Sequence, residues 1–267
     1  MPDIDLLFRQ RIGFPEDEEI TVDNLEVVLE LTAKSIPFEN ICVINNNVMV
    51  MNETNLVDKI LQHNEGGLCY ELNAILYLFL RENGLNVQLV RGTVYNKENG
   101  SFSPTGKTHV ATVLINGNER YLIDTGFGGN LPLVLVPFDG KVVRSWNGEF
   151  RVRKEDSEHG DYFLELKLKH KDDEWRKGYA FDSRQQMVNW DDLNVVQQII
   201  VEHPQSPFNK KPLLTKFTDG GNIILTKNSF IKWENGKMTK EEITEEKFES
   251  LAKAHFSIQK RALQKRA

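Results

Sequence analysis

The stretch EGGLCYELNAILYLFLRENG, residues 65–84, decides how the rest of the chain is interpreted. Its apolar residues follow the 3.6-residue period of an amphipathic helix: Leu72, Ile75, Leu76, Phe79 and Leu80. Asn83-Gly84 is a common stop signal, because glycine readily adopts the left-handed conformation that ends many helices. The stretch therefore predicts a helix that follows a glycine pair, and the patterning differs on its two sides.

The chain divides at the points where this patterning changes. Two further helical stripes, after Thr21 and Thr54, come before the stretch, so residues 1–85 are expected to be helical. Beyond it the apolar residues follow the pattern of strands, at residues 87–95, 109–115, 120–124 and 162–168. We therefore expect a second part at residues 86–194 and a third at residues 195–267.

The third part has a mixed pattern. It predicts a short helix at residues 195–201 and a strand pair at residues 222–225 and 229–233. Thr239 and Glu242 have the spacing of a capping box, which predicts a final helix from there to about Phe256.

Composition excludes several classes of protein. The 267 residues carry a formal net charge of −6, with 40% hydrophobic and 27% charged residues, so we expect a folded protein that binds no nucleic acid. The only two cysteines, Cys42 and Cys69, cannot form a disulfide framework, which fits the cytoplasm. No signal peptide or membrane-spanning run is recognised, and the six histidines are scattered, so we expect no membrane association and no metal site.

Cys69 is the first residue with a chemical interpretation. It follows Gly66-Gly67 and opens the predicted helix, where the positive end of the helix dipole favours a thiolate. The alternative is a small buried apolar residue, which is the usual role of a free cysteine. Cys42 has no glycine turn before it, and we interpret it as a core residue.

A predicted hairpin supplies a possible base for this thiol. Asn116-Gly117 is a strong signal for a two-residue type I′ turn. With that turn, His109 and Asp124 are direct cross-strand neighbours, with Cβ atoms about 5 Å apart. A carboxylate there can orient an imidazole, although an ordinary polar pair at a sheet end remains the alternative. Cys69, His109 and Asp124 together suit a thiol transferase or a thiol hydrolase.

These residues, with others, resemble the arylamine N-acetyltransferases. The resemblance is dense from about residue 36 to 130, and several motifs occur in the family's order: IPFENI (36–41), EGGLCYELN (65–73), VRG (90–92), TGKTH (105–109), IDTGFG (123–128) and PQSPF (204–208). It implies an α+β fold related to the cysteine proteases: a helical bundle, a β-barrel-like middle domain and a smaller α/β lid.

The resemblance also implies the chemistry. Cys69 would take an acetyl group from acetyl-coenzyme A, a co-substrate rather than a tightly bound cofactor, and an arylamine or arylhydrazine would then remove it. His109 would keep Cys69 as a thiolate, and Asp124 would orient His109. Phe38 and Phe127 match positions that line the acceptor pocket. Three residues match positions near the coenzyme: Thr105, Gly106 and Thr215.

One departure from the family concerns position 65. The family usually has an arginine there, which pairs with the glutamate of the Pro-Phe-Glu segment, but here position 65 is Glu65 and the partner position is Glu39. Two carboxylates in contact need another cation or a proton. Lys34 and Arg91 are the candidate partners.

Rival functions remain at this point. Gly106-Lys107-Thr108 imitates the end of a phosphate-binding loop, but Ser101 stands where that motif needs glycine, so we reject it. A coenzyme-independent thiol amidohydrolase or a transglutaminase-like enzyme would use the same three residue types, and a non-catalytic relative could bind only coenzyme A or an aromatic ligand. The sequence does not identify the natural acceptor or the oligomeric state.

Overall fold

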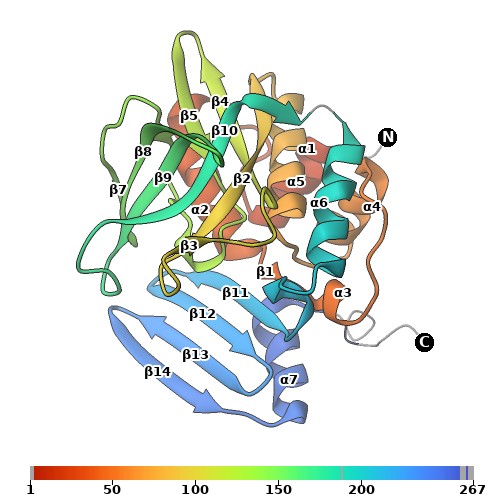
Figure 1. Ribbon diagram of the computed structural model, residues 1–267. Coiled ribbons are helices and arrows are strands. Elements are labelled where there is room, and N and C mark those ends of the chain that lie inside the picture. The colour runs from red at the N-terminus through yellow and green to blue at the C-terminus, as the bar shows by residue number, and fades with distance from the viewer. Residues whose placement is uncertain (1–2, 188, 259–262, 264–267) are drawn as a thin grey trace.

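The computed structural model describes residues 3–187, 189–258 and 263, and it has three parts (Figure 1). Most of the helices gather on one side of the molecule. The helices and short helical turns are α1 (Ile4–Ile12), η1 (Val22–Asn24), α2 (Leu25–Ser35), α3 (Ile41–Ile44), α4 (Glu53–Val57), the π-helical turn η2 (Asp58–Gln62), α5 (Cys69–Glu82), η3 (Gly128–Asn130), α6 (Trp190–Glu202), η4 (Pro207–Asn209) and α7 (Glu245–Phe256).

The central helix α5 is confirmed with the predicted bounds. It begins at Cys69, its C-cap is Asn83, and Gly84 has a φ of 77°. Its apolar face lies inside the helical core, where Ile75, Leu76 and Phe79 are fully buried. Burial of such side chains stabilises the fold by about 1.5–3 kcal/mol each.

The middle part is a curved antiparallel sheet, with the order β6-β5-β4-β2-β10-β9-β8-β7 and with β3 attached to β2. Its strands are β2 (Val87–Asn96), β3 (Ser101–Phe102), β4 (His109–Asn116), β5 (Glu119–Ile123), β6 (Val136–Pro137), β7 (Val143–Ser145), β8 (Gly148–Ser157), β9 (Gly160–Leu168) and β10 (Arg176–Met187). Because β6 at one end contacts β8 near the other, the sheet nearly closes on itself. The predicted barrel-like domain is confirmed.

The C-terminal part is a second antiparallel sheet covered by α7 on one face (Figure 1). Its strands are β11 (Leu213–Thr218), β12 (Gly221–Thr226), β13 (Ser229–Glu234) and β14 (Lys237–Glu242), and the two-residue strand β1 (Phe38–Glu39) pairs with β11. Through β1 the helical part and the C-terminal part share one sheet.

Two predictions about the C-terminal half are wrong. Thr239 and Glu242 do not cap a helix, because they lie in the exposed edge strand β14, and α7 is capped by Thr244, which accepts a hydrogen bond from the Lys247 N–H. The boundary at residues 194/195 falls inside α6. Leu193, Val196 and Ile200 of α6 belong to the helical core, so this helix packs with the N-terminal part.

No helix in the described ranges is both long enough and apolar enough to cross a membrane.

Candidate active site

The glycine pair before α5 allows the backbone to pass very close to its neighbours. A Cβ on Gly66 would lie 2.1 Å from the carbonyl oxygen of Pro37, and one on Gly67 would lie 2.8 Å from Glu71 Oε2. The loop therefore accepts only glycine at these positions without a shift. Cys69 follows as the first residue of α5, and its side chain is buried.

The hairpin of β4 and β5 forms, but with a different register from the predicted one. Asn116 pairs with Glu119, so the turn is Gly117-Asn118, with a φ of 59° at Gly117. Positive φ at the first central position is typical of a type II′ turn, not of the predicted type I′ turn. If continued, this register would set His109 opposite Gly126, so Asp124 is a diagonal neighbour rather than a direct one.

The histidine and the carboxylate nevertheless meet. His109 Nε2 lies 2.7 Å from Asp124 Oδ2, and both side chains are buried. Burial lowers the pKa of His109, but the charge and hydrogen bond of Asp124, together with Cys69, outweigh burial and raise that pKa to about 10. The imidazole is therefore protonated at neutral pH, and Nδ1 is left for Cys69.

Cys69 lies against the histidine strand. It contributes to the raised pKa of the His109 imidazole, and its Sγ lies 3.5 Å from the carbonyl oxygen of Thr108, the residue before that histidine. A Cβ on Gly126 would lie 2.4 Å from Cys69 Cα, so the glycine after Asp124 lets the β5 end reach the start of α5. The structure thus brings together the three residues that the sequence proposed.

Two residues of this site were missed. Asp124 also accepts hydrogen bonds from Asn73 Nδ2 at 3.0 Å and from the Tyr179 hydroxyl at 2.9 Å, besides the Gly126 N–H at 2.7 Å. Asn73 could have been found, because it lies four residues after Cys69 on the same helix face. Tyr179 comes from β10, a polar stretch whose sequence gave no clear pattern.

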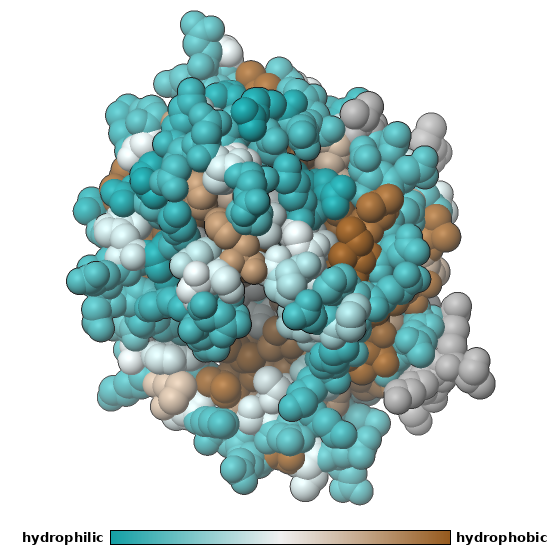
Figure 2. Space-filling view, viewed as in Figure 1, coloured by the Kyte–Doolittle hydropathy of each residue, from teal (hydrophilic) through white to brown (hydrophobic). Residues whose placement is uncertain are grey.

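A large cleft opens onto Cys69, with a volume of about 910 Å³. In Figure 2, hydrophobic surface is visible in the hollow between the middle part and the C-terminal sheet. The cleft lining includes both predicted acceptor residues, Phe38 and Phe127, and two of the three predicted coenzyme residues, Thr105 and Thr215. Gly106 is not among the lining residues, because it lies in the turn behind Thr105, where its φ is 67°.

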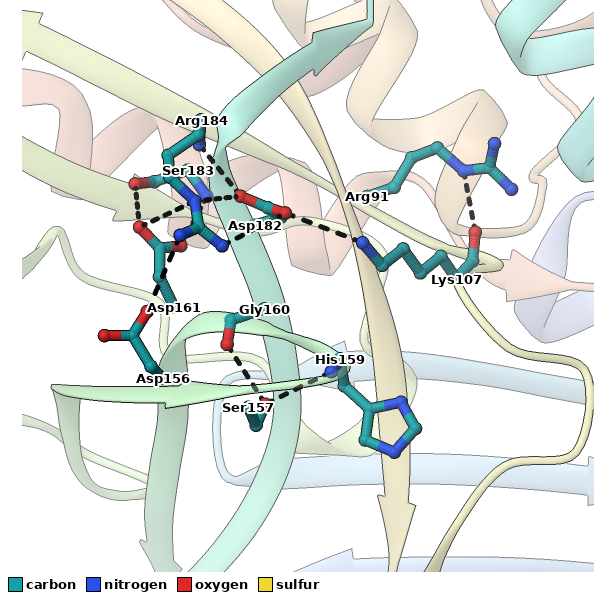
Figure 3. Close-up of polar contacts among 10 residues, drawn as sticks. All are labelled: Arg91, Lys107, Asp156, Ser157, His159, Gly160, Asp161, Asp182, Ser183 and Arg184. Carbon is teal, nitrogen blue, oxygen red and sulfur yellow. Dashed lines mark hydrogen bonds and ion pairs between the residues drawn. The ribbon is translucent and has the colours of Figure 1, made fainter.

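Polar contacts with residues of β2 and β10 hold the loop before His109 (Figure 3). Arg91 Nε donates a hydrogen bond to the Lys107 carbonyl oxygen at 2.7 Å, and Lys107 Nζ lies 3.6 Å from Asp182. Asp182 in turn accepts a hydrogen bond from Arg184 Nε at 2.9 Å. These contacts hold Lys107, two residues before His109, by its backbone carbonyl and by its side-chain ammonium.

The cation beside Glu39 is neither of the two predicted ones. Lys34 pairs with Glu30 and Asp219, and Arg91 is used by the Lys107 carbonyl. The cation beside Glu39 is Lys59, whose Nζ lies 3.8 Å from Glu39 Oε1. Sequence patterning did not suggest Lys59, because a lysine on a helix is normally solvent-exposed.

No cluster of three or more potential metal ligands occurs among the residues that the structure describes.

The comparisons with known proteins agree on one family. An N-acetyltransferase family model matches residues 21–264. An uncharacterised acetyltransferase of Bacillus subtilis is 38% identical over 248 residues, which cover 92% of this chain and 95% of that protein. A probable arylamine N-acetyltransferase of Dictyostelium discoideum is 33% identical, over 85% of this chain and 82% of its own.

The fold agrees as well. The crystal structure of an arylamine N-acetyltransferase from Bacillus cereus is 42% identical, with a TM-score of 0.91, and the match covers 97% of this chain and 99% of the other. That protein is described as having a unique Cys-His-Glu catalytic triad, whereas the carboxylate here is Asp124. Family model, relatives and structure agree, and this chain belongs to the arylamine N-acetyltransferase family.

Proposed function

We propose that this protein transfers an acetyl group from acetyl-coenzyme A to the amine of an arylamine or arylhydrazine, through a thioester on Cys69. The observation that carries this proposal is that Cys69 and His109 both line the large cleft, with His109 hydrogen-bonded to the buried Asp124 behind it. A thiolate is both a strong nucleophile and a good leaving group, which acyl transfer needs twice.

In the first half-reaction the Cys69 thiolate attacks the carbonyl carbon of the acetyl thioester. The tetrahedral intermediate collapses, the bond to the coenzyme sulfur breaks, and His109 gives its proton to the leaving thiolate. The Cys69 N–H belongs to the first turn of α5, whose amides have no intrahelical acceptor. It is therefore a donor for the oxyanion that develops on the acetyl oxygen.

In the second half-reaction the amine attacks the acetyl carbon. Acetylation of Cys69 removes the negative charge that helps to raise the pKa of His109. The imidazole, neutral since it gave its proton to the coenzyme thiolate, accepts the proton of the attacking amine. The bond from the acetyl carbon to Cys69 Sγ then breaks, which restores the thiolate beside a protonated His109. Asp124 keeps Nε2 occupied through its hydrogen bond, so that Nδ1 serves the reaction.

The lining of the cleft fits the two substrates. Phe38 and Phe127 offer aromatic surface on which the ring of an arylamine can stack. Thr105 and Thr215 also line this cleft and would contact the coenzyme. Both cysteines are free, and a nucleophilic thiol has to remain reduced, which supports the cytoplasm as its compartment.

The test is intact mass spectrometry of the protein after incubation with acetyl-coenzyme A alone. We expect one added acetyl group on Cys69, which a later dose of an arylamine or hydrazine removes. Cys69→Ala should abolish the adduct and leave less than about 1% of the turnover, whereas Cys42→Ala, the matched control, should keep both. No adduct on a rapidly alkylated Cys69 would indicate a thiol hydrolase, and no adduct on an unreactive Cys69 would indicate a non-catalytic binding protein.

A further inference from the structure

We propose that Lys59 is a positioning residue for the nucleophile: its buried ammonium holds Glu71 and Glu39 in the geometry that fixes Cys69. The inference rests on the proposed function, since it concerns the same thiol. It adds a residue from the π-helical turn η2, which lies outside every motif that identified the site.

A short series of contacts connects Lys59 to the start of α5. Lys59 Nζ lies 2.5 Å from Glu71 Oε1, and Glu71 Oε2 accepts a hydrogen bond from the Leu68 N–H at 2.9 Å. Leu68 is the N-cap of α5 and directly precedes Cys69. A displacement of the Glu71 carboxylate would therefore move the backbone that carries the nucleophile.

A second series connects Lys59 to the loop before Cys69. Lys59 Nζ is 3.8 Å from Glu39 Oε1, and the Glu39 N–H donates to the Gly67 carbonyl oxygen at 2.9 Å. Glu39 also accepts a hydrogen bond from the Ile41 N–H at 2.5 Å. The neighbouring Phe38 lines the catalytic cleft and pairs with Thr215 of β11. One ammonium thus holds the carboxylates of two segments that meet at Cys69.

The charges around Lys59 make it difficult to replace. Burial raises the pKa of Glu39, and so do the nearby carboxylates of Glu71 and Glu65, while Lys59 lowers it. Burial disfavours the charged form of Lys59, but Cys42, Glu71 and Glu39 raise its pKa well above the usual value. Without the ammonium, neighbouring buried carboxylates would repel each other until they moved or took up a proton.

The structure also shows why the cation can come from η2. A cavity of about 350 Å³ lies beside this cluster, with Lys59, Glu65, Tyr70 and Glu71 in its lining. An arginine at position 65 would have space to extend there. Lys59 therefore supplies, from another segment, the charge that an arginine at position 65 would supply.

The experiment measures the single-turnover rate constant of Cys69 acetylation by rapid-quench mass spectrometry, with saturating acetyl-coenzyme A. This rate constant does not depend on the fraction of folded protein, so loss of stability alone would not change it. For Lys59→Met we expect a decrease of roughly 10- to 100-fold with little change in the coenzyme concentration at half-saturation, because small misplacements of a reacting group are costly. Lys59→Arg should stay within about threefold of the wild type. The double variant Lys59→Met/Glu65→Arg should recover most of the lost rate.

Lys34→Met is the matched control, because Lys34 makes its ion pairs, with Glu30 and Asp219, at a more exposed site. Cys69 in this variant should be acetylated at the wild-type rate. If Lys59→Met does not fold, Glu71→Gln is measured in its place. Its amide oxygen can still accept the hydrogen bond from the Leu68 N–H, but the charge that binds Lys59 is lost. The rate constant of Cys69 acetylation should then be several-fold lower than in the wild type. A wild-type rate in the folded variant would overturn the inference, and so would a Lys59→Arg protein as slow as Lys59→Met. A wild-type protein that forms no acetyl adduct would instead refute the proposed function.

Discussion

Two buried ionic clusters lie on opposite sides of the first turn of α5, and they use charge differently. Cys69 and Glu71 are two residues apart on the helix, about 200° around its axis, so their side chains point in opposite directions. The front cluster, Cys69 with His109 and Asp124, faces the cleft. The rear cluster, Glu71 with Lys59 and Glu39, faces the smaller cavity and the packed loop.

The front cluster has one carboxylate with four hydrogen-bond donors, and the rear cluster has two carboxylates, Glu71 and Glu39, around the single ammonium of Lys59. Asp124 accepts hydrogen bonds from His109, Tyr179, Asn73 and Gly126, so its position is fixed. In the rear cluster, Lys59 stands between Glu71 and Glu39 and has a pKa well above its usual value. An imidazole whose pKa changes when its neighbour is acetylated can transfer protons, whereas such an ammonium can only hold charges in place.

The largest effect should come from removing the charge of the front carboxylate. Asp124→Asn retains the shape but can no longer stabilise the imidazolium or fix its tautomer, and we expect kcat to fall about 10⁴-fold, as in other triads. Steady-state acetyl transfer to an arylamine measures it. Asp161→Asn, a buried carboxylate outside the cleft that accepts hydrogen bonds from Ser183, is the control and should keep near-normal activity. A near-normal rate for Asp124→Asn would mean that the front cluster does not work as a triad.

The front cluster could be predicted from sequence because it depends on local patterns. Cys69 was found from a glycine pair and a helical period, and His109 with Asp124 from a hairpin. The predicted register was wrong, yet the pair was right. Moving the turn by one residue changes each partner by two positions, and side chains two apart in a strand share a face.

The rear cluster could not be predicted because its contacts are tertiary. Lys59 faces inward from a π-helical turn, and nothing in the helical stripe after Thr54 indicates that a lysine there is buried. Similarly, β14 was missed because all of its residues are exposed, so it has no alternation and is defined by its pairing with β13. Such features depend on which segments meet, and no local pattern reports that.

The pH dependence of stability should separate the two clusters. The pKa of His109 is raised from about 6.5 in the unfolded chain to about 10 in the folded protein. Its protonated form therefore stabilises the fold fully below about pH 6.5, and this contribution is lost as the pH rises toward 10. Urea unfolding of the wild type and of His109→Gln should give a difference in unfolding free energy that shrinks between pH 6.5 and 10.

Lys59→Met supplies the contrasting measurement in the same experiment. Because the pKa of Lys59 lies well above its usual value, the difference in unfolding free energy between wild type and this variant should stay nearly constant between pH 8 and 10. Parallel curves for His109→Gln and wild type would show that His109 does not hold its proton in the folded state.

The smallest effect concerns the two thiols, one at each cluster. Burial raises the pKa of Cys42 to about 12, although Lys59 opposes the shift, so only about one molecule in 10⁵ carries the Cys42 thiolate at pH 7. Iodoacetamide at pH 7 should therefore label Cys69 and leave Cys42 almost unmodified, as peptide mapping would show, and Cys42→Ala should not change the rate of labelling at Cys69. If Cys42 reacted as fast as Cys69, the ammonium of Lys59 would be stabilising a second thiolate. Charge in the rear cluster would then create a nucleophile, and the distinction between a reacting cluster and a holding cluster would fail.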